Sequence, residues 1–312
     1  MESPRATREG YADALIELGK ELPNVVVLDS DLSKSTGAVK FSREFPDRFF
    51  NCGVAEQSMM GTAAGLASCG KICYTGSFAI FATGRAFEQI RNTIAYCSFE
   101  VKICPSHAGI TVGPDGGSHQ SIEDIALMRS IPGMKVVVPA DYTEARAAVK
   151  AAAKIPGPIY IRLGRPKLER VYDDDYIFEL GRARVLRPGA DVTILAIGVM
   201  VPQALEAANI LASRHDISAE VINIITVKPI DEDTILASVR KTSSVVTAEE
   251  HSIIGGLGGA VSELLGEKMP TPMRRIGIAD AFGASGTAAE LMSHFKLTAD
   301  YIAAAALELA RL

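Results

Sequence analysis

"KICYTGSFAIFATGRAFEQIRNTIAYCSFEVKIC" (residues 71–104) contains a strand pattern, a helix pattern and a second strand pattern. The apolar runs at 71–76 and 101–104 are typical of buried strands, whereas residues 87–97 place apolar side chains at helical spacing. Two strands joined through a helix run parallel, and a parallel sheet is covered by helices on both faces. The stretch therefore predicts an α/β fold.

The same alternation continues on both sides of this stretch. Further strands are expected at 24–29, 134–139 and 158–163, with helical patterns between them, one of which starts at a capping-box pattern formed by Ser121 and Asp124. An acidic, turn-rich segment follows, and then a second series of strands begins near residue 191. We expect two α/β domains, each a mostly parallel sheet flanked by helices, at 1–170 and 186–312, with a linker at 171–185.

Composition excludes several classes of protein. The 312 residues are 48 % hydrophobic and carry a formal net charge of -5 without a long run of one sign, which argues against nucleic acid as the main partner. The N-terminus lacks an apolar signal region and no stretch reaches the ~20 apolar residues of a membrane span. The five cysteines lack a CxxC pair, as is typical of reduced thiols. We expect a soluble, cytoplasmic protein.

Glu56 is the first candidate site residue. It is the single carboxylate in "FFNCGVAEQSMMGTAAGLASCG" (49–70), among small and apolar residues. One interpretation places it at the exposed start of a helix beginning near Val54, where the macrodipole favours an acid. The other is that Glu56 is buried and meets a group outside this chain, because a buried carboxylate needs a partner.

The loop "SHAGITVGPDGGSHQ" (106–120) follows a predicted strand and is rich in glycine. Ligands of open parallel sheets bind at the carboxyl ends of the strands, so His107, Asp115 and His119 are candidates for ligand contacts. A metal site formed by these three residues and an ordinary polar loop are the alternatives, although their spacing matches no common metal-ligand pattern.

Two further groups have both a structural and a functional interpretation. Arg8, Ser35 and Arg165 are either surface residues or an anion site, since arginine pairs with phosphate through two parallel hydrogen bonds. Phe78 and Phe81 are either core residues or a platform for a flat cofactor ring.

These stretches together resemble the C-terminal half of transketolase, in the family's order and across nearly the whole chain. The motifs that carry the resemblance are "TREGYADALIELGKELPNVVVLDSDLSKST", "FPDRFFNCGVAEQSMMGTAAGLA", "GSFAIFATGRAFEQIR", "SHAGITVGPDGGSHQSIEDIALMRSIPGMKVVVPAD", "GPIYIRLGRP", "TVKPID" and "TAEEHSIIGGLGGAV". The resemblance implies a thiamine diphosphate enzyme that moves a two-carbon ketol unit between phosphosugars.

The resemblance also implies roles for individual residues. Glu56 would hydrogen-bond a ring nitrogen of the cofactor's aminopyrimidine and stabilise its imino form, with Phe78 packing on that ring and Phe81 nearby. Asp31 would lie close to the cofactor at a subunit interface. Substrate contacts are implied for His107, for Asp115 at a sugar hydroxyl, for His119 near the reacting carbonyl, and for a phosphate clamp of Arg8, Ser35 and Arg165.

Two departures from the family pattern matter. Thr83 and Gly84 follow Phe81 where relatives often have a third aromatic residue or compact spacing, and we expect the family's metal- and diphosphate-binding domain to lie on another chain. We therefore expect a split enzyme in which an N-terminal-half subunit holds the diphosphate and a divalent metal (Mg or Ca), in an α2β2 heterotetramer. The alternatives are a 1-deoxyxylulose-5-phosphate synthase-like subunit, a 2-oxoacid dehydrogenase beta-like subunit, and a non-catalytic assembly subunit.

Overall fold

The first half of the chain is built on a parallel sheet, as the alternating pattern predicts. The computed structural model describes residues 3–311, and its larger sheet has seven strands in the order β12-β6-β7-β5-β4-β2-β3. The strands of the first half in it are β2 (Val25–Asp29), β3 (Phe49–Asn51), β4 (Ile72–Gly76), β5 (Val101–Ile103), β6 (Lys135–Val137) and β7 (Ile159–Ile161). All of these pair in parallel.

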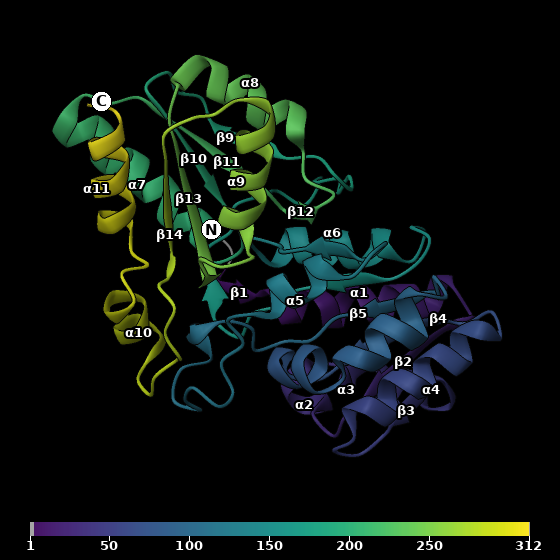
Figure 1. Cartoon of the computed structure of the whole chain (residues 1–312). Coiled ribbons are helices and arrows are strands. Elements are labelled where there is room, and N and C mark those ends of the chain that lie inside the picture. The colour runs from purple at the N-terminus through teal and green to yellow at the C-terminus, as the bar shows by residue number, and fades with distance from the viewer. Residues whose placement is uncertain (1–2, 312) are drawn as a thin grey trace.

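Helices cover both faces of this sheet (Figure 1). They are α1 (Thr7–Glu21), α2 (Ser33–Thr36), α3 (Val39–Glu44), α4 (Glu56–Ser68), α5 (Asp124–Ser130) and α6 (Tyr142–Ala152). Side chains alternate along a strand, so Val25 and Val27 face the cluster with α1 and α6, whereas Val26 and Leu28 face the cluster with α4.

The second half forms a five-stranded sheet in the order β14-β13-β10-β11-β9. Its strands are β9 (Arg184–Arg187), β10 (Val192–Ala196), β11 (Ala219–Asn223), β13 (Val245–Ser252) and β14 (Met273–Ile278). Its helices are α7 (Met200–His215), α8 (Glu232–Thr242), α9 (Leu257–Lys268), α10 (Ala288–His294) and α11 (Ala299–Leu309), with α7 and α11 packed together on one side of the sheet (Figure 1).

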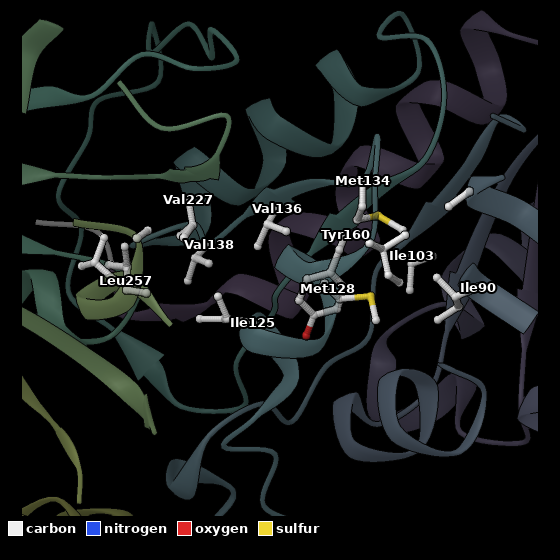
Figure 2. Packing of buried hydrophobic residues seen from close by; sticks show 14 of the residues in the cluster. Ile90, Ile103, Ile125, Met128, Met134, Val136, Val138, Tyr160, Val227 and Leu257 are labelled. Carbon is white, nitrogen blue, oxygen red and sulfur yellow. The ribbon is translucent and has the colours of Figure 1, made fainter. Parts of the chain in front are cut away.

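The two halves share a hydrophobic core. One cluster of buried side chains joins Ile103 and Val136 of the first sheet to Val227 and Leu257 of the second half, as Figure 2 shows. In addition, β12 (Thr226–Lys228) leaves the second half and pairs antiparallel with β6, which extends the first sheet. The halves are therefore joined by backbone hydrogen bonds as well as by apolar packing.

The segment between the halves is held in place by side chains. Tyr176 donates to Glu144 at 2.9 Å, and the amide of Asn223 donates both to Glu144 and to the hydroxyl of Tyr172. A short ladder of β1 (Arg5–Ala6) and β8 (Lys167–Leu168) precedes this segment. The boundaries 1–170, 171–185 and 186–312 stay a prediction, although β9 already brings residue 184 into the second sheet.

One local prediction was wrong, and two others are made more specific. Helix α4 begins at Glu56, close to the predicted start near Val54. Ser121 does not cap α5, which begins at Asp124, because the carboxylate of Asp124 pairs with buried Arg162 at 2.7 Å. Within 77–97, much of the chain is π-helical, as η2 (Phe81–Arg85) and η3 (Gln89–Ala95). No helix among residues 3–311 is long and apolar enough to cross a membrane.

Candidate functional site

The candidate residues lie at one edge of the larger sheet. Ser35 follows β2, Glu56 follows β3, Phe78 follows β4, His107 follows β5 and Arg165 follows β7. These strands are parallel, so their carboxyl ends lie along the same edge and the loops after them face one region. The sequence-based expectation of a shared ligand edge therefore agrees with the topology.

Glu56 is buried and has a partner within the chain. Its side chain is 1 % exposed, so the interpretation as an exposed helix start was wrong. One carboxylate oxygen pairs with Nη1 of Arg85 at 3.0 Å, and the other accepts a hydrogen bond from Oγ of Ser77 at 3.3 Å. The α4 N-terminus adds a favourable dipole. The second interpretation, in which Glu56 meets a group outside this chain, did not include these two contacts within the chain.

Arg85 connects Glu56 to the aromatic pair. Its guanidinium lies 4.7 Å from the ring centroid of Phe81, and the rings of Phe78 and Phe81 are near parallel with centroids 6.3 Å apart. The π-helical turn η2 spans Thr83 and Gly84 and ends at Arg85. π-Helical turns are rare and frequently mark functional sites.

Both histidines of the 106–120 loop contact the aromatic pair. His107 stacks on Phe78 with centroids 4.0 Å apart, and His119 lies edge-on to Phe81 at 5.4 Å. Burial, followed by the positive charges of Arg8 and Arg165, lowers the pKa of His107 to about 3. His107 is therefore neutral at pH 7 and able to donate and accept one hydrogen bond each.

His107 also lies next to Arg8, which lines a cationic pocket. Its Nε2 lies 3.4 Å from Nη1 of Arg8, which donates to the carbonyl of Ser35 at 2.7 Å. A pocket of about 290 Å³ lies beside Arg8 and is lined also by Arg165 and Lys167. Burial and then the charge of Arg165 lower the pKa of Arg8, so the two guanidiniums repel each other across a space suited to an anion.

Two candidates lie at the margin of this cluster. Asp115 is exposed and pairs with Nη1 of Arg165 at 3.5 Å, which places it at the pocket mouth. Asp31 is exposed, has a left-handed backbone and exchanges hydrogen bonds with Asn51. Both of these hydrogen bonds join Asp31 to Asn51, and neither reaches Glu56 or the aromatic pair.

Sequence reasoning missed residues of the second half that hold the site loop. Glu250 accepts a hydrogen bond from the backbone N–H of Thr111 at 2.6 Å, and Gln120 donates to the carbonyl of Ala284 at 2.8 Å. Two adjacent acids inside the apolar strand pattern 244–250 were a usable signal of a buried polar network. The sequence gives no comparable signal for Arg85, a single arginine in a helical pattern.

The arrangement fits a flat, nitrogen-containing ring better than a metal ion. Among residues 3–311, no three His, Cys, Asp or Glu side chains converge on a point where they could hold a metal. The aromatic rings, linked through Arg85 to a buried carboxylate, provide one flat apolar wall and one polar anchor. Phe78, Phe81 and Glu56 are thus the residues that could hold the aminopyrimidine of thiamine diphosphate.

Comparisons with family models and with individual proteins identify the same family for this chain. Residues 3–170 match the model of the transketolase pyrimidine binding domain, and residues 181–302 match that of the transketolase C-terminal domain. A putative transketolase C-terminal section of Methanocaldococcus jannaschii is 50 % identical over 302 residues, covering 96 % of this chain and 94 % of that protein. A 6-deoxy-6-sulfo-D-fructose transketolase subunit of Clostridium sp. is 46 % identical, covering 96 % of this chain and 93 % of that protein.

Two further relatives indicate how much of a transketolase this chain represents. Human transketolase is 36 % identical over 96 % of this chain but 48 % of its own length. A solved structure described as a split gene transketolase, inactive beta4 tetramer, superposes with a TM-score of 0.91 at 50 % identity and covers 99 % of both chains.

Proposed function

Because the chain belongs to the transketolase family, we propose that it is the C-terminal subunit of a thiamine diphosphate-dependent transketolase. The reaction is the transfer of a two-carbon ketol unit from a ketose phosphate to an aldose or aldose phosphate, as in pentose phosphate and related carbohydrate metabolism. When bound, the cofactor supplies the carbanion chemistry. The protein binds and orients the cofactor and the sugar, and it moves protons at the reacting groups.

The single observation that carries this proposal is the buried carboxylate of Glu56, whose partner Arg85 lies over the ring of Phe81 in the aromatic pair. In the proposed site, Glu56 holds the ring nitrogen of the aminopyrimidine and exchanges a proton with it. Phe78 and Phe81 pack on the ring and exclude water. A carboxylate in such a dry site has a strong electrostatic effect on its partner.

We assign substrate binding to the contacts that continue from this pair. Arg8 and Arg165 bind the phosphate of the sugar in the cationic pocket. Ser35, which does not line that pocket, completes the proposed clamp through its carbonyl, which accepts a hydrogen bond from Arg8. His107, which is neutral at pH 7, hydrogen-bonds the sugar, and His119 moves a proton at the reacting oxygen. Asp115 binds a hydroxyl group once its loose contact with Arg165 is exchanged for substrate.

We propose that a second polypeptide completes the enzyme. Relatives of this length are described as a C-terminal section or a subunit, and this chain spans about half of human transketolase. The partner would be an N-terminal-half subunit that holds the cofactor's diphosphate and a divalent metal, Mg or Ca, in an α2β2 assembly, with Asp31 near the interface. The inactive beta4 relative supports dependence of activity on such a partner. The unbridged cysteines support a cytoplasmic location.

The test is to purify this chain alone and together with an N-terminal-half subunit. We expect ketol transfer from hydroxypyruvate to an aldose phosphate only in the mixture, and thiamine diphosphate binding only when both chains are present. Full activity from this chain alone would contradict the split-enzyme proposal.

A matched assay separates the related reactions. With pyruvate and glyceraldehyde phosphate as substrates, a 1-deoxyxylulose-5-phosphate synthase-like subunit would form product. A 2-oxoacid dehydrogenase beta-like subunit would consume pyruvate without a sugar once an oxidised lipoyl compound is added as the electron and acyl acceptor. The cationic pocket favours a phosphosugar over a simple oxoacid. A complex that binds cofactor but turns over none of these substrates would indicate a non-catalytic assembly subunit.

A further inference from the structure

We propose that Arg85 is the positioning residue of Glu56, and that its ion pair fixes the carboxylate that meets the cofactor ring. The inference rests on the proposed function but concerns a residue of this chain that the sequence pattern did not mark. Arg85 lies 29 positions from Glu56 along the chain, so only the fold brings the two together.

Burial explains why Glu56 needs Arg85. A carboxylate removed from water costs several kcal/mol unless it is paired and hydrogen-bonded. Within residues 3–311, the side-chain contacts of Glu56 are the ion pair with Arg85 at 3.0 Å and a longer hydrogen bond from Ser77 at 3.3 Å. Arg85 therefore supplies the main compensation for the buried charge and the stronger of two restraints on its orientation.

Arg85 is itself held in place by two other contacts. Its guanidinium lies over the ring of Phe81 at 4.7 Å, and its backbone carbonyl accepts a hydrogen bond from Nε2 of Gln57 at 3.3 Å. Gln57 is the neighbour of Glu56 on α4, so the end of turn η2 is tied directly to the start of that helix. The carboxylate, the guanidinium and the aromatic wall are thus fixed as one unit.

The geometry also explains why the residue is arginine. A planar guanidinium stacks on an aromatic face while its edge donates to a carboxylate, whereas a lysine ammonium is a point charge that cannot do both. The side chain is 50 % exposed, so solvent reaches its outer nitrogens and its replacement leaves no large cavity. A substitution therefore removes the pairing without removing core packing.

The first test is a double-mutant cycle on this chain without cofactor. We expect Arg85→Gln to lower the melting temperature by several degrees, because it leaves the buried Glu56 carboxylate without its ion-pair partner and with only the longer hydrogen bond from Ser77. In a Glu56→Gln background, the same substitution should change the melting temperature by less than about one degree. Arg214→Gln, which removes an exposed arginine at the end of α7, is the charge-matched control and should not depend on the Glu56 background. An Arg85 effect that persists at full size in the Glu56→Gln background overturns the pairing.

The second test uses the co-purified complex with thiamine diphosphate and measures exchange of the thiazolium C2 proton by NMR. We expect Arg85→Gln to slow this exchange at least tenfold, with Arg85→Lys partly restoring it and the KM for the phosphosugar changing less than twofold. Exchange at the wild-type rate in Arg85→Gln, with slow exchange in Glu56→Gln, refutes the positioning role but leaves the proposed function standing. Exchange at the wild-type rate in both variants refutes the proposed function itself.

Discussion

The carboxylate of Glu250 accepts a hydrogen bond from the backbone N–H of Thr111 at 2.6 Å, across 139 positions of the chain. Glu250 lies on β13 of the second half, and Thr111 lies in the loop that carries His107, Asp115 and His119. Gly109 belongs to the same loop with φ +79, and a Cβ there would lie 2.2 Å from the Glu250 carboxyl group. The second half therefore shapes the loop that the proposed substrate contacts.

Removing the Glu250 acceptor is expected to loosen this loop. Glu250→Ala leaves the Thr111 N–H buried and unpaired, at a cost of about 1–3 kcal/mol. We expect the KM of the assembled enzyme for the phosphosugar to rise about tenfold, while affinity for thiamine diphosphate changes little. Glu250→Gln, which keeps an acceptor oxygen, should stay close to wild type.

Steady-state kinetics with separate titration of cofactor and sugar measures both quantities. Glu267→Ala, which removes an exposed acid on α9 of the same half, is the matched control. Equal losses in Glu250→Ala and Glu250→Gln would show that the charge matters and not the hydrogen bond to the loop.

Substituting Glu56 addresses the chemistry directly. Glu56→Gln keeps the shape of the side chain but cannot exchange a proton with the ring nitrogen. We expect turnover to fall by about 10²–10⁴-fold, the range typical of general acid–base groups, while circular dichroism and the melting temperature stay close to wild type. The control is Glu88→Gln, an exposed acid beside the same region. Wild-type turnover in Glu56→Gln would remove the catalytic assignment.

The cationic pocket predicts a dependence on the sugar's phosphate. Hydrogen bonds to charged groups contribute about 1.5–3 kcal/mol, so Arg8→Gln and Arg165→Gln should each raise the KM for a phosphorylated acceptor by roughly 10- to 100-fold. Glycolaldehyde, which carries no phosphate, serves as the internal comparison and should show little change. If both acceptors lose the same factor, the two arginines act on the fold or on catalysis, and not on phosphate.

Glu144 predicts a pH dependence of stability. Burial raises its pKa from 4.5 to about 7, against hydrogen bonds from Ala140, Asn223 and Tyr176 that favour the charged form. The folded chain therefore holds this proton more tightly than the unfolded chain. Its contribution is full below about pH 4.5 and is lost as the pH rises through about 7.

We expect this contribution, on the order of 3 kcal/mol for the shift from 4.5 to about 7, to be absent in Glu144→Gln. Urea unfolding at pH 5, 6.5 and 8 should show that the free energy of unfolding of the variant rises relative to that of wild type as the pH rises. Glu267→Gln, which changes an exposed acid on α9, should show the same pH dependence of the free energy of unfolding as wild type. A constant difference between Glu144→Gln and wild type at the three pH values would contradict the raised pKa.

Sequence periodicity determined the architecture well. The runs 24–29, 71–76, 101–104, 134–139 and 158–163 became β2, β4, β5, β6 and β7, all parallel, because alternation of apolar strands and amphipathic helices is a local signal. Periodicity did not reveal β12, a three-residue strand whose pairing with β6 depends on a neighbour some 90 positions away. The Ser121–Asp124 pattern failed for the same reason, since the distant Arg162 takes the Asp124 carboxylate.

The sequence by itself determined that this chain is a two-part α/β protein of the transketolase family, with His107 and Arg165 following its strands. Only the tertiary structure decided that Arg85 pairs with Glu56 and that Glu250 holds the loop at Thr111. The physical reason is that burial is a property of the assembled fold. Whether a charge loses its water, and which distant group compensates for that loss, is settled when elements far apart in the chain pack together.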